Sequence, residues 1–215
     1  DKDDIDAVND VLRNKSITQG ELVDNFEKKI SSYVNSKYAV AVTSCSAGLH
    51  LSCNILKIKN KNVITSPITF ASTASSILHN GGKLKLVDIS HKNINIDLEK
   101  IKNFNFKVHT VIPIHFSGAA VELENFKKEN PKIKIIEDSA HALGAKYKSG
   151  HMVGSCKYSD MSIFSLHPAK TITSGEGGII TTNNKKYYNM LKLLSNNGVQ
   201  KNKNDFKLKK YKNNM

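Results

Sequence analysis

One stretch of the chain, residues 133–145, reads IKIIEDSAHALGA. It opens with a short, mostly apolar run at 133–136, which is typical of a β-strand buried on both faces. Glu137 and Asp138 follow this run directly. Two carboxylates at the end of a buried strand are unfavourable unless a cation or a hydrogen-bond donor meets them. The stretch therefore predicts a buried strand that ends in a polar site.

The same kind of run recurs along the chain and alternates with segments of helical periodicity. Strands are predicted at residues 39–43, 63–65, 84–87, 108–114, 133–136, 161–164 and 179–182. Helices are predicted at residues 21–34, 47–56, 70–78, 121–129 and 185–194. Strands that alternate with helices require crossover connections, so we expect an α/β fold with a mainly parallel sheet and helices on both faces. In such sheets, ligands bind beyond the carboxyl ends of the strands.

Composition limits the class of protein. The 215 residues are 39% hydrophobic and 24% charged, which suits one globular domain. Three cysteines, Cys45, Cys53 and Cys156, are too few and too odd in number for a disulfide framework, and no C-x-x-C pair suggests zinc. No apolar stretch approaches the roughly 18 residues that span a bilayer, and the acidic first residues do not resemble a signal peptide. We therefore expect a cytoplasmic protein without a metal site or membrane contact.

The formal net charge of +13 raises the question of a nucleic-acid partner. Arg13 is the only arginine, and the lysines are scattered among asparagines instead of gathering with aromatic residues. Arginine is the side chain that grips phosphate and guanine through two hydrogen bonds. We therefore predict no nucleic-acid partner.

The chain shows no internal repeat. We expect residues 1–200 to form one domain, followed by a truncated tail rich in Lys and Asn at 201–215. Because the first residue is not methionine and the last ones form a polar run, we expect the chain to be the N-terminal part of a longer protein.

Small residues follow the first predicted strand. Residues 43–48 read TSCSAG and lead directly into a predicted helix. Bare backbone N–H groups at a helix start form an anion cradle, although a plain N-cap by Ser44 or Ser46 fits the same letters. The G-x-G-x-x-G and G-x-x-x-x-G-K-[ST] fingerprints of nicotinamide and nucleoside-triphosphate sites are absent from the sequence.

The sequence leaves several roles open for Asp138 and for His141, three residues later. Asp138 could hold a metal, cap the next segment or pair with a protonated ring nitrogen of a ligand. His141 could be a metal ligand, but no partner at zincin spacing accompanies it, and a structural histidine fits as well.

A third strand end, residues 164–178, reads FSLHPAKTITSGEGG. Lys170 is the only basic residue besides His167 between positions 161 and 180. A lysine among small and apolar neighbours loses water and is more easily kept uncharged, as an amine must be to attack a carbonyl carbon. The glycines at 175, 177 and 178 would let the backbone pass close to a bulky ligand.

Together, the three strand ends supply what pyridoxal phosphate requires. The helix start near Ser46 would take the phosphate, Asp138 the ring nitrogen and Lys170 the aldehyde. Phe70, at the start of a predicted helix, would stack on the ring, and otherwise it is a core phenylalanine.

The segments 17–20, 38–50, 66–70, 137–145 and 164–178 resemble the sugar aminotransferases of the DegT/DnrJ/EryC1/StrS family. The similarity extends over essentially residues 1–200, and the SLHPAK motif is most similar to the branch that acts in pseudaminic acid synthesis. The resemblance implies fold type I of the pyridoxal-phosphate-dependent transferases, with a C-terminal small domain beyond this chain. It also implies a homodimer, whose partner would donate an asparagine to the phosphate from beyond Met215.

The resemblance further implies a role for each matching position. Lys170 would bind the cofactor covalently and move a proton, Asp138 would bind the ring nitrogen, and His141 would lie near the ring hydroxyl. Phe70 would stack on the ring. The remaining implied contacts are those to the phosphate from Cys45, Ser46 and Ser165, and those to the sugar nucleotide from Lys15, Ser16, Ile17 and Thr18.

The implied reaction moves an amino group from L-glutamate to C4 of a UDP-linked 4-keto-6-deoxy-hexose. Alternatives are another nucleotide keto-sugar, a dehydratase, in which histidine replaces the lysine, a cysteine desulfurase, and a basic binding module without activity. Two departures from the family pattern occur. Cys45-Ser46-Ala47 alters the hydroxyl groups of the phosphate loop, and residues 195–198 lack an arginine that relatives carry.

Overall fold

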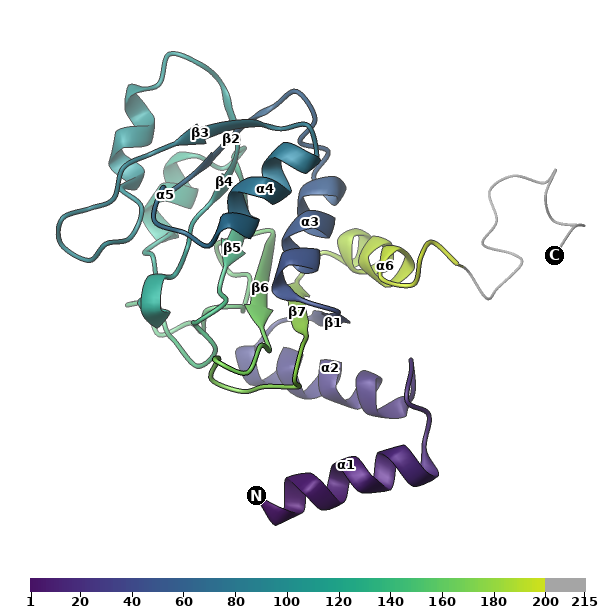
Figure 1. Ribbon diagram of the computed structural model, residues 1–215. Helices are drawn as coiled ribbons and strands as arrows, with labels where there is room; N and C mark the ends of the chain where they lie inside the picture. The colour runs from purple at the N-terminus through teal and green to yellow at the C-terminus, as the bar shows by residue number, and fades with distance from the viewer. Residues whose placement is uncertain (200–215) are drawn as a thin grey trace, which may run out of the picture.

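The computed structural model describes residues 1–199 of the chain (Figure 1). A seven-stranded sheet forms its centre, in the order β1-β7-β6-β5-β4-β2-β3. The strands are β1 (Tyr38–Val42), β2 (Asn62–Thr65), β3 (Lys83–Leu86), β4 (Val108–Ile112), β5 (Lys134–Asp138), β6 (Met161–Ser165) and β7 (Gly178–Thr182). All seven predicted strands are confirmed, with ends that differ by a few residues.

The predicted parallel arrangement is confirmed for most of the sheet, and β7 is the exception. This strand runs antiparallel to both β6 and β1. Residues 166–177, which join β6 to β7, contain no helix. A short connection without a crossover helix must return antiparallel to the strand it leaves. The loop that carries Lys170 therefore lies at the carboxyl end of β6.

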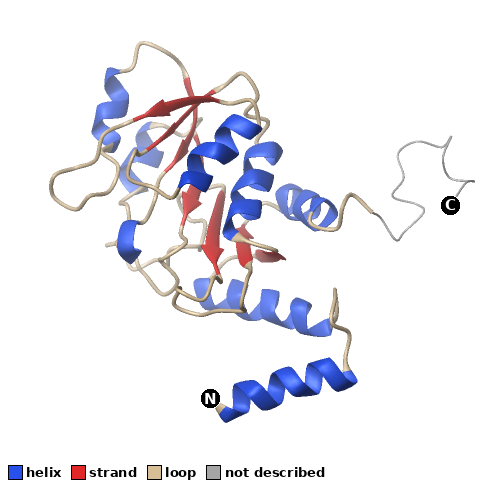
Figure 2. Ribbon diagram, in the orientation of Figure 1, coloured by secondary structure: helices blue, strands red, loops and turns tan. Residues whose placement is uncertain are grey.

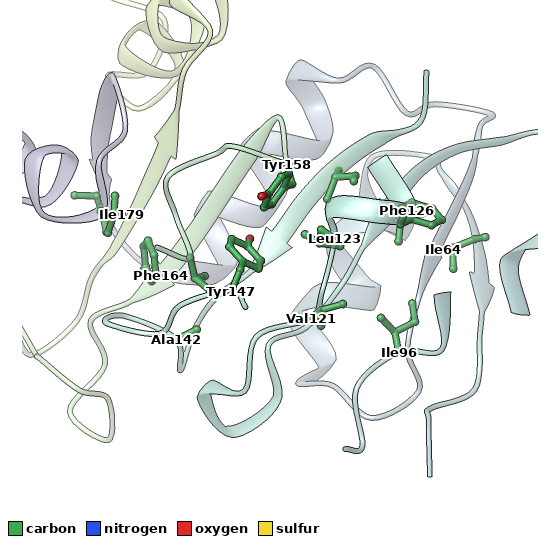
Figure 3. Close-up of a cluster of buried hydrophobic side chains, with 14 of the residues drawn as sticks. Ile64, Ile96, Val121, Leu123, Phe126, Ala142, Tyr147, Tyr158, Phe164 and Ile179 are labelled. Atoms are coloured by element: carbon green, nitrogen blue, oxygen red, sulfur yellow. The ribbon is translucent and has the colours of Figure 1, made fainter. Parts of the chain in front are cut away.

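Helices cover both faces of the sheet (Figure 2). The α-helices are α1 (Lys2–Asn14), α2 (Glu21–Val34), α3 (Cys45–Ile55), α4 (Ala71–His79), α5 (Glu124–Glu129) and α6 (Lys185–Leu194), and the short 3-10 helices are η1 (Leu98–Asn103) and η2 (Phe116–Gly118). Successive strand residues face opposite sides, so Ile135 joins one buried cluster with α2 and α5, and Ile136 joins the other with α3 and α6. Figure 3 shows the first of these clusters, which contains Tyr147 and Tyr158.

The helix predictions are confirmed closely at α2 and α6 and less closely elsewhere. The helix predicted at 121–129 covers only Glu124–Glu129, because Val121 and Leu123 are buried in the first cluster before the helix begins. Helix α1 was not predicted. It starts with a capping box between Asp1 and Asp4. Its apolar residues Ile5, Val8 and Leu12 recur at helical spacing but are exposed, so the pattern that predicts a helix is present in the sequence and was overlooked.

Two further features bear on the classes of protein considered above. Within residues 1–199, no helix combines the length and the apolar character that a membrane span requires. The same residues contain no group of three or more His, Cys, Asp or Glu side chains placed to hold a metal ion. The predicted tail at 201–215 lies outside the described residues.

Candidate active site

The candidate site lies at the carboxyl ends of β5 and β6. Asp138 and Ser165 are the last residues of these strands, and the loop with Lys170 follows Ser165. In Figure 1 the β6 arrow points toward this loop, and the start of α3 lies nearby. The register explains this proximity, because Ser165 pairs with Gly178, which pairs with Val42 on its other side. The strand that precedes α3 is thus brought to the end of β6.

Asp138 has a buried carboxylate and neutral hydrogen-bond partners. Asp138 is only 4% exposed. Oδ2 accepts a hydrogen bond from the Thr73 hydroxyl at 2.7 Å, and Oδ1 accepts one from the backbone N–H of Ala140 at 3.2 Å. The second contact is the capping role considered for this residue. Within the described residues the negative charge has no ion-pair partner, and such a buried anion is well suited to a cationic ligand group.

Lys170 and His141 meet at the same edge of the sheet. The Nζ atom of Lys170 lies 2.6 Å from Nε2 of His141. The pKa of His141 is lowered, chiefly by loss of water and then by the positive charge of Lys170, while the charge of Asp138 acts in the opposite direction. A neutral imidazole can accept a hydrogen bond from the lysine ammonium. The two predicted site residues are therefore brought together, and His141 is placed to position the amine.

Lys170 is only partly withdrawn from water in this structure. The residue is half-buried, and residues 171–176 are exposed. The physical reason is that the connection between β6 and β7 runs over the surface with no helix above it. Withholding water from this amine therefore requires something other than the described residues.

The start of α3 forms the predicted anion cradle and is capped as well. Ser44 is the N-cap and accepts a hydrogen bond from the N–H of Ala47 at 3.0 Å. The N–H groups of Cys45 and Ser46 have no partner among the described residues. A methyl group on Gly178 would lie 2.6 Å from the carbonyl carbon of Ser44. Only glycine lets β7 begin so close to this turn, which leaves an open cradle of backbone donors.

Cys45 lies within electrostatic reach of the other site residues. Burial raises the pKa of its thiol well above the usual value, the charge of Asp138 raises it further, and the charge of Lys170 opposes the shift. The side chain is half-buried by surface area. The thiol is therefore protonated at neutral pH and can act as a weak donor, as distinct from a reactive thiolate. Ser165, also half-buried, accepts a hydrogen bond from the N–H of His167 at 3.3 Å.

Phe70 is not a core residue. It is the N-cap of α4 and is 78% exposed. The alternative of an ordinary buried phenylalanine is therefore wrong. One turn further on, the N–H of Thr73 donates to the carbonyl of Phe70 at 3.1 Å, and the Thr73 side chain reaches Asp138. The first turn of α4 thus holds Asp138 through Thr73. It also leaves the exposed ring of Phe70 available to stack on a planar ligand.

The structure does not bring the segment 15–18 to the other site residues. Lys15, Ser16, Ile17 and Thr18 are exposed and lie in the connection between α1 and α2, away from the loop that carries Lys170 (Figure 1). Lys15 forms an ion pair with Asp10 at 2.8 Å. Lys15 and Ser16 help to line a separate depression of about 300 Å³ at the start of α2. Their predicted contact with a sugar nucleotide stays a prediction.

Sequence reasoning missed Thr73 and the partners of Glu137. Glu137 is fully buried and accepts hydrogen bonds from His115 Nε2 at 2.7 Å and from the hydroxyls of Tyr147 and Ser159. Nδ1 of His115 accepts the N–H of Val121 at 2.9 Å, so the neutral imidazole carries its proton on Nε2. Of these residues only His115 gives a signal in the sequence, as a polar residue within the apolar segment 111–116.

Comparison with known proteins shows the family of this chain. The family model of the DegT/DnrJ/EryC1/StrS aminotransferases matches residues 1–215. The chain belongs to the DegT/DnrJ/EryC1/StrS aminotransferase family. It is 40% identical over 209 residues to a UDP-4-amino-4,6-dideoxy-N-acetyl-β-L-altrosamine transaminase of Campylobacter jejuni (strain 81-176), covering 94% of this chain and 54% of that protein.

Solved structures of aminotransferases share the fold. PseC of Helicobacter pylori, an aminotransferase involved in the biosynthesis of pseudoaminic acid, superposes with a TM-score of 0.85 at 28% identity, covering 97% of this chain and 56% of PseC. The pyridoxal-phosphate form of Spr1654, a sugar aminotransferase from Streptococcus pneumoniae, gives a TM-score of 0.81 at 27% identity, covering 90% and 55% of the two chains. The predicted aminotransferase fold is confirmed. The chain spans about half the length of the curated relatives it matches.

Proposed function

We propose that residues 1–200 are the cofactor-binding large domain of an aminotransferase that uses pyridoxal phosphate and acts on a nucleotide-linked keto-sugar. One observation carries the proposal. Within residues 1–199, the buried carboxylate of Asp138 meets only neutral donors, and it lies at the same sheet edge as Lys170 and the N–H groups of α3 that have no partner there. The N–H groups can bind a phosphate, the carboxylate can bind a protonated ring nitrogen, and the amine can bind an aldehyde. These are the three polar groups of this cofactor.

The residues of this chain fit the cofactor group by group. The N–H groups of Cys45 and Ser46, with the hydroxyls of Ser46 and Ser165, would bind the phosphate at the positive end of α3. Asp138 would accept a hydrogen bond from the protonated ring nitrogen, and the exposed ring of Phe70 would cover one face. When bound, pyridoxal phosphate supplies an aldehyde that carries the amino group and a protonated ring that takes up electrons.

Two side chains would handle the chemistry at the amine. Lys170 would bind the cofactor through Nζ, after transferring a proton away from its ammonium form, and would then move protons as a general acid and base. His141 Nε2 lies 2.6 Å from Nζ, where it can accept such a proton or fix the position of the amine. The lowered pKa of His141 keeps this nitrogen available as an acceptor at neutral pH.

We propose L-glutamate as the amine donor and C4 of a UDP-linked 4-keto-6-deoxy-hexose as the acceptor. The support for a UDP-linked sugar is the name of the Campylobacter jejuni relative and its match over most of this chain. The support for the amine donor is membership of the aminotransferase family. Lys15, Ser16, Ile17 and Thr18 are the residues we propose for the sugar nucleotide. We further propose a cytoplasmic homodimer, for which the family membership is the support.

Absorbance of the full-length protein tests the cofactor assignment. With pyridoxal phosphate added, we expect a visible absorbance band from the lysine-bound cofactor that Lys170→Ala abolishes. Lys186→Ala is the matched control, because this lysine is exposed on α6. Unchanged absorbance in Lys170→Ala refutes the assignment of the lysine.

Product analysis tests the substrate. L-Glutamate and a UDP-linked 4-keto-6-deoxy-hexose should yield 2-oxoglutarate and the 4-amino sugar. Formation of a deoxygenated sugar without a new amine would indicate a dehydratase. Turnover of only another nucleotide sugar would correct the acceptor and leave the reaction class in place.

A further inference from the structure

A chain of hydroxyl groups ends on the carboxylate of Asp138. The Thr69 hydroxyl donates to Oγ1 of Thr73 at 2.8 Å, and the Thr73 hydroxyl donates to Oδ2 of Asp138 at 2.7 Å. Thr73 is fully buried. An ionised carboxylate can only accept, so the Thr73 proton must point at Asp138 while its lone pair receives the proton of Thr69. The direction of the chain is therefore set by the charge at its end.

The two oxygens of Asp138 depend on different donors. Oδ1 has the backbone N–H of Ala140, which no side-chain substitution removes, and Oδ2 has only the hydroxyl of Thr73 among the described residues. Hydrogen bonds to the charged form of a buried acid both stabilise that form and fix its orientation. Loss of the Thr73 hydroxyl would leave Oδ2 buried without a protein donor.

The charged and titratable groups around Asp138 do not replace this donor. Cys45 from α3, His141 from the segment after β5 and Lys170 from the loop after β6 interact with one another or with Asp138 through their charges. None of the three donates a hydrogen bond to Asp138 within residues 1–199. Thr73 is thus the one side chain of the described part that holds this carboxylate directly.

The same helix start also presents Phe70. Phe70 is the N-cap of α4, and Thr73 lies three residues later in its first turn. The backbone hydrogen bond from the N–H of Thr73 to the carbonyl oxygen of Phe70, at 3.1 Å, fixes the relative positions of the two residues. One turn of α4 therefore sets both the ring available for stacking and the acid available for a ring nitrogen.

We propose that Thr73 is a positioning residue that holds the carboxylate of Asp138 in place and oriented toward the ring nitrogen of the cofactor, with Thr69 supporting it. This inference rests on the proposed function. It predicts that the hydroxyl at position 73 controls the protonation of the cofactor ring as well as the affinity for it. A hydroxyl that served only to fill the interior would affect neither property.

Three variants of the full-length protein test the inference. Thr73→Val keeps the shape and removes the hydroxyl, and Thr73→Ser restores the hydroxyl. Ser75→Ala removes a hydroxyl from the same helix that, in the described part of the chain, donates only to the carbonyl of Ser72. Three quantities are measured for each variant. They are the dissociation constant for pyridoxal phosphate, the pH at which the ring nitrogen loses its proton, and the Tm without cofactor. Nitrogen NMR of labelled cofactor gives the second of these.

We expect Thr73→Val to weaken cofactor binding about ten- to a hundredfold, the range for a lost hydrogen bond to a charged group. We also expect the ring nitrogen to lose its proton at lower pH, because a less firmly held anion stabilises the ring cation less. Thr73→Ser and Ser75→Ala should behave like the parent protein in both respects.

Several results would overturn the inference and are separable from failure of the proposed function. A Thr73→Val protein with a lower Tm but unchanged affinity and ring protonation would show a structural hydroxyl only. If Thr73→Val does not fold, Thr69→Val decides the matter: we expect a shift of a few-fold in the same direction, and no shift overturns the inference. A parent protein that never binds pyridoxal phosphate through lysine refutes the proposed function itself.

Discussion

Glu137 and Asp138 are successive residues of β5, and their surroundings differ sharply. Glu137 faces the cluster of Figure 3, where His115, Tyr147 and Ser159 all donate to it. Asp138 faces the side of α3 and α4 and, among the residues that the structure describes, accepts hydrogen bonds only from Thr73 and one backbone N–H. Both acids are buried. The comparison shows that burial of an acid does not by itself indicate a ligand-binding site. A buried carboxylate that can still accept hydrogen bonds, and that lies beside other ligand-binding groups, does.

The largest expected effect is on folding, at Glu137. Glu137→Ala leaves three donors without this acceptor, and two of them, His115 and Tyr147, are buried. We therefore expect the free energy of unfolding to fall by about 3–5 kcal/mol. Urea unfolding followed by circular dichroism measures this. Glu129→Ala, at an exposed glutamate paired with Lys102, is the control and should cost under about 1 kcal/mol. A loss at Glu137 no larger than the control would contradict the view of this acid as a structural acceptor.

Asp138→Asn should separate binding from stability. Asparagine keeps the shape and can still accept a hydrogen bond from Thr73, so we expect the free energy of unfolding to change by no more than about 1 kcal/mol. Without the negative charge, the affinity for pyridoxal phosphate should fall at least about tenfold. Parallel urea unfolding and absorbance titrations check both numbers. An Asp138→Asn protein that unfolds as easily as Glu137→Ala but binds the cofactor normally would reverse the comparison.

Tyr147→Phe should have an intermediate effect on stability. The change removes one of the three donors to Glu137 and keeps the ring, which packs edge-on against Tyr158 at a centroid distance of 5.2 Å. Burial and the charge of Glu137 raise the pKa of Tyr147, so the phenol stays protonated as a donor. We expect a loss of about 1–2 kcal/mol in urea unfolding with cofactor affinity unchanged. A change in cofactor affinity would show that the two sides of β5 are coupled.

The smallest expected effect is a titration shift at His141. The charge of Lys170 is one cause of its lowered pKa, so Lys170→Met should raise the pKa of His141 toward its ordinary value. Proton NMR of the histidine ring across the pH range measures this. Because the folded pKa is lowered, protonation opposes folding: the penalty is absent above the ordinary histidine pKa and grows as the pH falls below it. A pKa that stays the same or falls would show that the two groups do not interact in solution.

The strands and the residues at their ends were predictable because they depend on local patterns. Short apolar runs followed by polar residues located Asp138, Ser165 and Lys170 at one sheet edge. The antiparallel direction of β7 and the exposed state of the Lys170 loop were not anticipated, since both depend on a connection that lacks a helix. Helix α1 was predictable as well, because Ile5, Val8 and Leu12 recur at helical spacing, but this pattern was overlooked.

The contacts that distinguish the two acids were not predictable. Thr73 reaches Asp138 across 65 positions of the chain, and His115 reaches Glu137 across 22. Such pairs arise from strand order and helix placement, and a single hydroxyl or imidazole in the sequence does not reveal its distant partner. The period of two along β5 does place the two acids on opposite faces. It does not say which face holds the ligand.

A crystal structure of the full-length protein with pyridoxal phosphate tests the central claim most directly. The account predicts continuous density between Nζ of Lys170 and the cofactor. It also predicts that the ring nitrogen lies about 2.7–2.9 Å from the carboxylate of Asp138, as charge-assisted hydrogen bonds do. A cofactor bound elsewhere, or one whose ring nitrogen points away from Asp138 with Lys170 unattached, would contradict it.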